Sequence, residues 1–246
     1  MEQRRDGLPT NVMALYHFLA LHQASCLPIK RFQALTRKTR IGPGLAMTET
    51  HSALAASKAE WRKQALARRK AVSAEVREAF AGRLAIEGVK LARRAIVKNV
   101  SAYWPIGSEA DPRLLLAALD YHQFSTLLPV TQERGEPLIF RRWREGQRLI
   151  DGPMGLKEPS RHLPEAIPQM LFVPLAAFDR RGFRIGYGAG HYDVTLAHLR
   201  ARGPAPAIGV AFACQEIPRV PEEDHDQPLD FVLTENELID CSLAWT

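Results

Sequence analysis

The sequence predicts an α/β fold, one three-layer domain built on a mostly parallel sheet. Three observations support this fold class. Strand-like and helix-like segments alternate from Lys58 onward, residues 169–177 form an apolar run typical of a buried strand, and a glycine-rich loop (residues 186–190) follows it and precedes a helix. In sheets of this kind, ligands bind outside the carboxyl ends of the strands. We therefore expect the functional site beside the glycine-rich loop.

The first two helices are predicted from composition and from a capping residue. Residues 58–70 are rich in Ala, Arg, Lys and Leu, all of which favour helix. Ser73 is placed to cap a second helix, in which Val76, Phe80 and Leu84 would share one apolar face.

The remaining elements follow from end signals and from alternation of apolar residues. Asp111 is a suitable N-cap and Pro112 a suitable first residue for a helix over 113–119, and a last helix is expected over 191–202. Strands are expected at residues 97–104, 124–130, 138–143, 169–177, 207–212 and 230–233.

Composition indicates an ordinary globular chain with a basic N-terminal segment. The 246 residues are 46% hydrophobic and 24% charged, which is enough to bury a sizeable core. Residues 1–57 carry seven Lys/Arg against three Asp/Glu and so account for most of the net charge of +6. Because this excess lies outside the regular part of the chain, we expect no nucleic-acid partner.

Regular patterning begins at Lys58, so we expect residues 58–246 to form the functional domain. Residues 1–57 show no sustained helical or strand period. Three interpretations of this N-terminal extension stay open: a disordered tail, a targeting segment, or an upstream extension of a start at Met47. The tail and the misplaced start are favoured.

The chain carries no sequence signal for a membrane or an oxidising compartment. The apolar run over residues 12–21 is too short for a bilayer, which needs roughly 20 residues. Cys26, Cys214 and Cys241 are scattered, without the spacing of a zinc site or a disulfide framework. We therefore expect a cytoplasmic protein with no membrane partner, and a monomer.

The glycine-rich loop favours anion binding. Gly186, Gly188 and Gly190 carry no Cβ, so a ligand can approach the backbone, and the helix that follows offers unpaired N–H groups to a phosphate. Tyr192 and Asp193, in the first helical turn, would line the same anion-binding site. The loop is neither a Walker A element nor a GxGxxG fingerprint. By itself, therefore, a tight turn explains it about as well as a phosphate cradle.

Two charged pairs add to this prediction. Lys58 and Arg62 lie four residues apart on one helix face, where a solvated basic face is the plain alternative. Glu109 and Asp111 lie in a loop just after a strand, where carboxylates are often functional, although N-capping accounts for Asp111.

Two further segments and one histidine have both a functional and a plain reading. Residues 152–159, rich in Gly and Pro, would shape a pocket wall or simply connect two elements. The cluster Asp224, His225, Asp226 and Asp230 suits Mg²⁺ near phosphate, or else forms a solvated acidic loop. A histidine at a helix start, such as His191, is more often a structural hydrogen bonder than a catalyst.

Taken in order, these motifs resemble the 5-formyltetrahydrofolate cyclo-ligase (methenyltetrahydrofolate synthetase) family over about residues 58–238. The motifs are Lys58-x-x-x-Arg62, Pro-Ile-Gly-Ser-Glu109, residues 152–159, the long motif over residues 173–193, and His225-Asp226-x-x-x-Asp230. The resemblance implies a Rossmann-like fold similar to sugar-phosphate isomerases and CoA transferases. It also implies ATP and Mg²⁺ as cofactors and 5-formyltetrahydrofolate, with or without a polyglutamate tail, as the small-molecule substrate.

The implied reaction is an ATP-dependent ring closure that yields 5,10-methenyltetrahydrofolate, ADP and phosphate. The formyl oxygen would attack the γ-phosphate to give a phosphorylated imidate, on which the neighbouring nitrogen closes. Two alternatives stay open: a non-catalytic folate- or nucleotide-binding relative, and a sugar-phosphate isomerase of related fold.

The resemblance also implies residue roles. Glu109 would bind the folate near its reacting end, Tyr192 would pack on the formyl and pterin region, and Arg184 would add charge beside the phosphates. Asp193 and Asp226 would contact Mg²⁺. The implied nucleotide-binding set is Lys58, Arg62, Gly186, Tyr187, Gly188, Ala189, Gly190, His191, Tyr192 and Asp193.

Three positions depart from the family pattern. Many members carry Arg and Lys where this chain has Tyr187 and Ala189, and Tyr where it has His191. The loss of two cations is expected to weaken ATP binding unless Arg184 and its neighbours compensate, because one charge-assisted hydrogen bond contributes ~1.5–3 kcal/mol.

Overall fold

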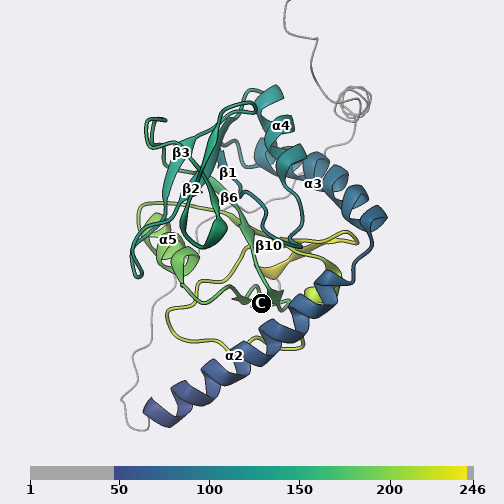
Figure 1. Ribbon diagram of the computed structural model, residues 1–246, viewed down its shortest axis with the longest axis vertical. Coiled ribbons are helices and arrows are strands. Elements are labelled where there is room, and N and C mark those ends of the chain that lie inside the picture. Colours follow the sequence, from purple (N-terminus) through teal and green to yellow (C-terminus); the bar gives the residue numbers. More distant parts are fainter. Residues whose placement is uncertain (1–46, 243–246) are drawn as a thin grey trace, which may run out of the picture.

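The computed structural model describes residues 47–242, and its largest element is a seven-stranded sheet in the order β11-β10-β9-β6-β1-β2-β3 (Figure 1). These strands are β1 (Asn99–Ser101), β2 (Ser125–Val130), β3 (Ile139–Arg142), β6 (Met170–Pro174), β9 (Ala207–Val210), β10 (Phe231–Leu233) and β11 (Leu238–Asp240). Strands β10, β9, β6, β1 and β2 run parallel, whereas the edge strands β3 and β11 pair antiparallel. The prediction of a mostly parallel sheet is confirmed.

Helices cover both faces of this sheet. They are α2 (Met47–Lys70), α3 (Ala74–Arg94), α4 (Arg113–Tyr121) and α5 (His191–Arg200). Phe172 of β6 belongs to the apolar cluster under α3 and α4, whereas its neighbours Leu171 and Val173 pack with Leu196 of α5. Successive side chains of a strand point to opposite faces. The helices α3 and α4 therefore lie on one face and α5 on the other, which gives the three expected layers (Figure 1).

Helix α2 lies across the carboxyl ends of the strands (Figure 1). Near its end, Arg69 donates a hydrogen bond to the carbonyl of Leu175, the residue after β6. The helix begins at Met47 rather than at Lys58, because residues 53–59 include four alanines, which have the highest helix propensity. The predictions for residues 1–46 lie outside the described residues.

The predicted strand over residues 169–177 is divided in two. Strand β6 ends at Pro174, which has no N–H to donate to a ladder. Beyond it, the carbonyls of Leu175 and Ala176 both accept hydrogen bonds from Nε2 of Gln215, at 2.9 Å each. The chain then forms a separate hairpin from β7 (Ala177–Phe178) and β8 (Arg184–Ile185), which the sequence did not predict.

The ends of α3 and α4 differ in detail from expectation. Ser73 caps α3 as predicted, and Phe80 and Leu84 are buried, but Val76 is exposed because it lies in the first turn, away from the core. At α4 the cap residue is Pro112 rather than Asp111, whose Oδ1 instead accepts a hydrogen bond from the first helical N–H at 2.9 Å. The other predicted strands and the last helix are present. Strands β2 and β10 end where predicted, whereas β1, β3, β9 and α5 end earlier than expected.

The Gly/Pro-rich segment over residues 152–159 is part of a hairpin that was also not predicted. Strands β4 (Leu149–Asp151) and β5 (Lys157–Pro159) pair antiparallel, and a 3₁₀ turn, η1 (Pro153–Gly155), joins them. A Cβ at Gly152 would lie 2.5 Å from Cδ of Glu158, so a larger residue there would displace the Glu158 side chain. Among the helices of residues 47–242, none combines the length and apolar character needed to cross a membrane.

Candidate active site at the carboxyl edge of the sheet

The glycine-rich loop joins β8 to α5 and faces solvent. Gly190 caps α5 with a φ of 72°, a left-handed conformation that favours glycine. Tyr187, Gly188 and Gly190 are exposed. The predicted order of strand, loop and helix is present, but the strand that precedes the loop is the short β8 and not the central strand β6.

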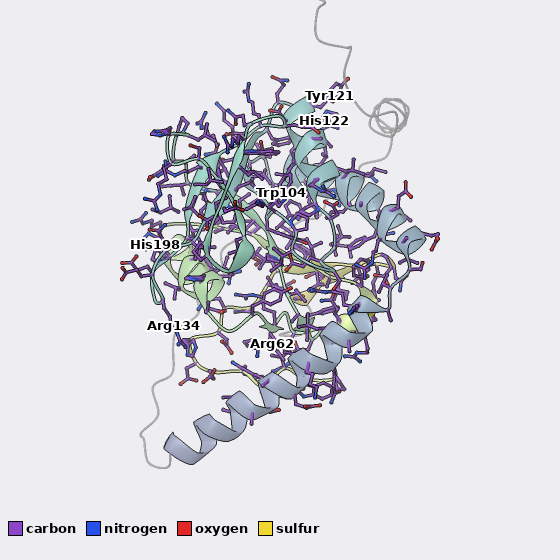
Figure 2. The ribbon with its side chains drawn as sticks, viewed as in Figure 1. Arg62, Trp104, Tyr121, His122, Arg134 and His198 are labelled. Carbon is purple, nitrogen blue, oxygen red and sulfur yellow. The ribbon has the colours of Figure 1, made fainter. Side chains whose placement is uncertain are left out.

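One face of α2 presents two cations to this loop and to the acidic loop that contains Glu223 and Asp226. Nε of Arg62 donates to the carbonyl oxygen of Gly186 at 2.7 Å, and Figure 2 shows Arg62 on the side of α2 that faces the sheet. Nζ of Lys58 donates to carboxylates of Glu223 and Asp226, both at 2.7 Å. The expected common face of Lys58 and Arg62 is therefore present and is packed against the loops.

The ammonium group of Lys58 is held in its charged form. Burial lowers the pKa of Lys58, but the hydrogen bonds to Asp226 and Glu223 and their negative charges raise it by more, so that the pKa lies above its ordinary value. Only 15% of the Lys58 side chain is exposed. This cation is therefore paired within the protein rather than free for a phosphate.

Glu109 is a buried carboxylate beside the glycine-rich loop. Oε1 of Glu109 accepts a hydrogen bond from the hydroxyl of Tyr187 at 2.6 Å, and Oε2 accepts one from the backbone N–H of Ile106 at 2.9 Å. Burial raises the pKa of Glu109, and the two hydrogen bonds and the charge of Arg69 offset only part of this effect. The structure thus places a desolvated carboxylate next to residues from three separate segments.

Two tyrosines near Glu109 stay neutral at physiological pH. Burial and the negative charge of Glu109 both raise the pKa of Tyr187, and the same two causes raise the pKa of Tyr192. The charge of Arg184 acts on Tyr192 in the opposite direction. Predicted residues from the glycine-rich loop, α5 and the loop after β1 are therefore within electrostatic range of each other.

Arg184 and Asp193 form an ion pair that connects the first turn of α5 with the acidic loop. Nη2 of Arg184 lies 2.8 Å from Oδ1 of Asp193, and its Nη1 donates to the carbonyl of Gln227 at 2.6 Å. The same Oδ1 atom accepts a hydrogen bond from the N–H of Gln227 at 3.0 Å. The carboxylate of Asp193 thus lies beside the residue that follows Asp226, and one of its oxygens is already occupied.

The acidic loop contains three residues that fit a metal ion. Ligand atoms of Glu223, His225 and Asp226 all lie within 4.8 Å of one another. Mg²⁺ prefers oxygen ligands, so the two carboxylates suit it better than the exposed imidazole of His225. Asp230 lies outside this cluster, because its Oδ2 accepts hydrogen bonds from Arg200 and from the N–H of Ala207.

His191 and Ala189 make few contacts in this region. Nδ1 of His191 is buried and has no hydrogen-bond partner among the described residues, while its carbonyl accepts from Oγ1 of Thr195 at 2.6 Å. Ala189 is half-buried in the loop.

Sequence reasoning missed two residues of this site, Arg69 and Glu223. Arg69 is 4% exposed, and its Nη1 donates to the hydroxyl of Tyr187 at 2.8 Å. Its spacing from Arg62, two helical turns, placed it on the same face of α2 and was the available signal. No comparable signal separated Glu223 from the other acids of its loop.

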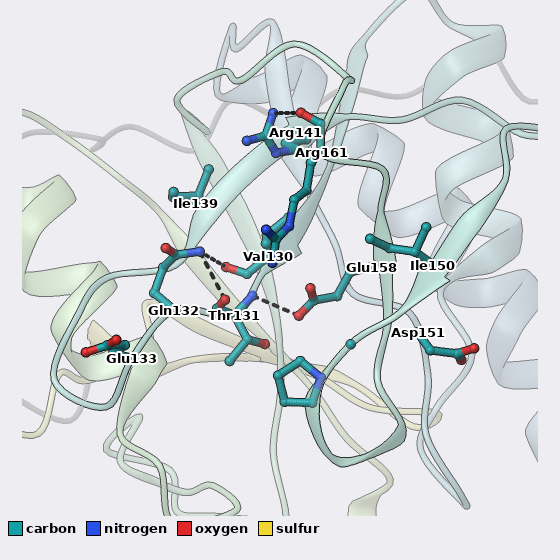
Figure 3. A pocket seen from close by; sticks show the side chains of 12 residues that line it. Val130, Thr131, Gln132, Glu133, Ile139, Arg141, Ile150, Asp151, Glu158 and Arg161 are labelled. Carbon is teal, nitrogen blue, oxygen red and sulfur yellow. Dashed lines mark hydrogen bonds between the residues drawn. The ribbon is translucent and has the colours of Figure 1, made fainter.

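A hollow of about 600 Å³ opens beside the carboxyl end of β2 (Figure 3). Gly152, Pro153 and Glu158 form part of its wall, so the Gly/Pro-rich segment lines a hollow and also connects β4 to β5. The N–H of Thr131 donates to Oε1 of Glu158 at 2.9 Å, and Arg161 reaches into the hollow. Glu109, Arg184 and Tyr192 are not among the lining residues.

The sequence matches a known protein family over most of the described region. The 5-formyltetrahydrofolate cyclo-ligase family model matches residues 54–235. A 5-formyltetrahydrofolate cyclo-ligase of Mycolicibacterium smegmatis is 35% identical over 191 residues, which cover 72% of this chain and 93% of the relative. The protein of the same name from Escherichia coli K12 is 26% identical, with 70% and 96% covered.

Two solved structures resemble the fold. A 5,10-methenyltetrahydrofolate synthetase of Aquifex aeolicus, 29% identical, aligns with a TM-score of 0.62 over 75% of this chain and 92% of its own. A 5,10-methenyltetrahydrofolate synthetase of Mycoplasma pneumoniae aligns with a TM-score of 0.57 over 75% and 98%, and at 22% identity it supports the fold alone.

Proposed function

The chain belongs to the 5-formyltetrahydrofolate cyclo-ligase family, and we propose that it converts 5-formyltetrahydrofolate and ATP into 5,10-methenyltetrahydrofolate, ADP and phosphate. One observation carries the proposal beyond family membership. Cations of α2, the glycine-rich loop, the buried carboxylate of Glu109 and an acidic loop converge at the carboxyl edge of one sheet. Phosphoryl transfer depends on positioning and on neutralised phosphate charge, which the loop and the cations would supply, while Glu109 would hold the folate.

The reaction needs two steps. First, the formyl oxygen attacks the γ-phosphorus; an O–P bond forms, the bridging P–O bond breaks, and ADP leaves. Second, the N10 nitrogen attacks the formyl carbon and loses its proton, while the C–O bond breaks and phosphate carries the electron pair away. An amide-like oxygen leaves poorly until it is phosphorylated, and the protein contributes mainly position and charge.

We assign the phosphates of ATP to the loop over residues 186–190 and to the α2 cations. Arg62 already contacts the loop through the carbonyl of Gly186, so its guanidinium is directed to this place. The pair formed by Arg184 and Asp193 fixes the first turn of α5, from which Tyr192 would pack on the pterin and the formyl group. Glu109 would accept N–H hydrogen bonds from the reduced pterin.

Mg²⁺, when bound, would neutralise charge on the phosphate oxygens. We assign it to Asp226 with Glu223, and to Asp193 directly or through water, because carboxylates are its preferred protein ligands. Lys58 now occupies both acidic-loop carboxylates. Once these carboxylates bind a cation, the ammonium of Lys58 is free to pair with a phosphate.

We further propose that the 600 Å³ hollow takes the glutamyl end of the folate, with or without further glutamates. Two carboxylates in its lining already have partners. Asp151 pairs with the side chain of Lys157, and Glu158 accepts a hydrogen bond from the N–H of Thr131. Arg161 has no acidic partner among the described side chains and reaches into the hollow (Figure 3). A free guanidinium there suits a carboxylate.

The proposed reaction is tested by following product absorbance in the near ultraviolet with enzyme, 5-formyltetrahydrofolate, ATP and Mg²⁺, leaving out one component at a time. We expect product only in the complete mixture, with one ADP per product. Product without ATP would refute the phosphoryl transfer. No product from folded protein that still binds folate would favour a non-catalytic relative.

The remaining finer expectations concern the cell. We propose that the protein is a monomer and lies in the cytoplasm, where free thiols persist. Cys214 and Cys241 are free. Sedimentation of the purified protein tests the oligomeric state.

A further inference from the structure

The hydroxyl group of Tyr187 connects two charged side chains. It accepts a hydrogen bond from Nη1 of Arg69 at 2.8 Å and donates one to Oε1 of Glu109 at 2.6 Å. A guanidinium can only donate, so the hydroxyl proton must point to the carboxylate. The polarity of this chain of hydrogen bonds is therefore fixed, and it is arranged to stabilise the ionised form of Glu109.

Tyr187 supplies a contact that the other groups around Glu109 do not. The charged and titratable groups that face this carboxylate are Arg69 from α2, Tyr103 from the segment after β1, Tyr187 from the loop and Tyr192 from α5. The hydroxyl of Tyr103 donates to the carbonyl of Ala110 instead, at 2.8 Å. Among the described residues, Tyr187 provides the side-chain hydrogen bond to Glu109.

Packing does not account for Tyr187. The residue is 43% exposed and lies in a solvent-facing loop, so its ring fills little of the core. Its hydroxyl is nevertheless directed inward to a carboxylate 78 positions earlier in the chain. A side chain that lies largely outside the core, and whose hydroxyl bonds two charged groups, is placed for its hydroxyl rather than for its volume.

We propose that Tyr187 is a positioning residue for Glu109: its hydroxyl fixes the orientation of the carboxylate and holds it in the ionised form that accepts hydrogen bonds from the folate. This inference rests on the proposed function and adds to it. The loop over residues 186–190, which we assign to the phosphates of ATP, would thereby also orient the carboxylate of Glu109, which we assign to the folate.

The test is Tyr187→Phe, which keeps the ring and removes only the hydroxyl. Loss of a hydrogen bond to a charged group should raise the pKa of Glu109 by about one pH unit. The acid limb of kcat/KM for 5-formyltetrahydrofolate should move to higher pH by the same amount. At pH values below the apparent pKa of that limb, the KM for the folate should rise, and the KM for ATP should change much less.

Two controls separate positioning from a general structural effect. Tyr121→Phe changes an exposed tyrosine at the end of α4, away from Arg62 in Figure 2, and should leave the pH profile in place. In a Glu109→Gln background, which has no carboxyl to titrate, Tyr187→Phe should shift nothing further. An unmoved acid limb in the single variant, or an equal shift in the Gln background, would overturn the inference.

A measurement without substrate separates this inference from the proposed function. The carboxyl ¹³C resonance of Glu109, assigned with Glu109→Gln, reports its pKa by NMR in the wild-type and Tyr187→Phe proteins. A higher pKa in the variant would support the positioning role even if the wild type formed no product. Equal pKa values would refute it even if the wild type were fully active.

Discussion

The ammonium nitrogen of Lys58 lies 2.7 Å from a carboxylate oxygen of Asp226, a residue 168 positions later in the chain. The second partner of Lys58, Glu223, lies in the same loop and at the same distance. This contact connects the helix across the strand ends with the loop to which we assign Mg²⁺. Binding of nucleotide and metal would have to break the contacts of Lys58 with these carboxylates. The ion pairs therefore couple the proposed nucleotide site to the proposed Mg²⁺ site.

Replacing Lys58 by Ala should raise the KM for ATP about tenfold or more, because a charge-assisted hydrogen bond to phosphate is lost. The KM for 5-formyltetrahydrofolate should change much less. Steady-state kinetics with each substrate varied in turn measures both. Lys63→Ala, an exposed position on the same helix, is the matched control. An equal rise in both KM values would contradict the role of Lys58.

Replacing Asp226 by Asn should raise the Mg²⁺ concentration that gives half-maximal activity by at least about tenfold, since an anionic oxygen ligand is removed. Titration of Mn²⁺ binding by electron paramagnetic resonance provides a readout independent of turnover. Asp224→Asn is the control, because Asp224 is exposed in the same loop but outside the cluster. Equal effects of the two substitutions would remove Asp226 from the metal site.

Glu109 should make stability depend on pH in a specific direction. Its pKa is raised by burial in the folded state above the ordinary value of 4.5. Between these two pKa values the folded state binds more protons than the unfolded state, so the free energy of unfolding falls as pH rises through that interval. This cost is absent below the unfolded value and complete above the folded one.

Glu109→Gln should therefore gain stability relative to the wild type as pH rises from the ordinary pKa of 4.5 through the raised pKa of the folded state. The same variant should raise the KM for folate more than the KM for ATP. Urea unfolding of both proteins across this range measures the difference. A gap between the two proteins that is constant with pH, or that changes in the opposite direction, would contradict the raised pKa.

Arg161→Ala should raise the KM for a polyglutamylated folate roughly fivefold, the size of an exposed ion pair, and the KM for ATP should stay the same. The comparison needs mono- and polyglutamylated substrates side by side. Arg202→Ala, an exposed arginine just after α5, serves as control. If the variant treats both folates as the wild type does, the glutamyl end lies elsewhere.

Deleting residues 1–46 should leave kcat and both KM values within about twofold, since the described site draws on residues from Lys58 onward. Activity of the truncated and full-length proteins is compared at equal active concentration. A loss of turnover in soluble truncated protein would show that the N-terminal extension takes part in the site.

The sequence predicted the mostly parallel sheet and the glycine-rich loop before α5 because both depend on local patterns. Alternating apolar strands and a glycine loop before a helix are visible within a few residues. The hairpins β4–β5 and β7–β8 were not predicted, because strands of two or three residues are too short to show an alternating apolar pattern.

Pairings across the chain could not be predicted from such patterns. The contact of Tyr187 with Glu109 depends on how the loop folds back over the sheet. The sequence does not distinguish a buried Arg69 from a solvated one. Its hydrogen-bond partners, Leu175 and Tyr187, are distant in the chain. Tertiary packing, rather than propensity, decides these contacts.

Phosphorylation of the formyl oxygen is tested most simply with 5-formyltetrahydrofolate labelled with ¹⁸O in the formyl group. If the formyl oxygen attacks the γ-phosphate, that oxygen leaves with the phosphate, and mass spectrometry will find one ¹⁸O atom in each phosphate released. We expect this transfer to depend on ATP and to be lost together with the activity in inactive variants. Product formation with unlabelled phosphate would contradict it, because ring closure would then proceed without a phosphorylated imidate.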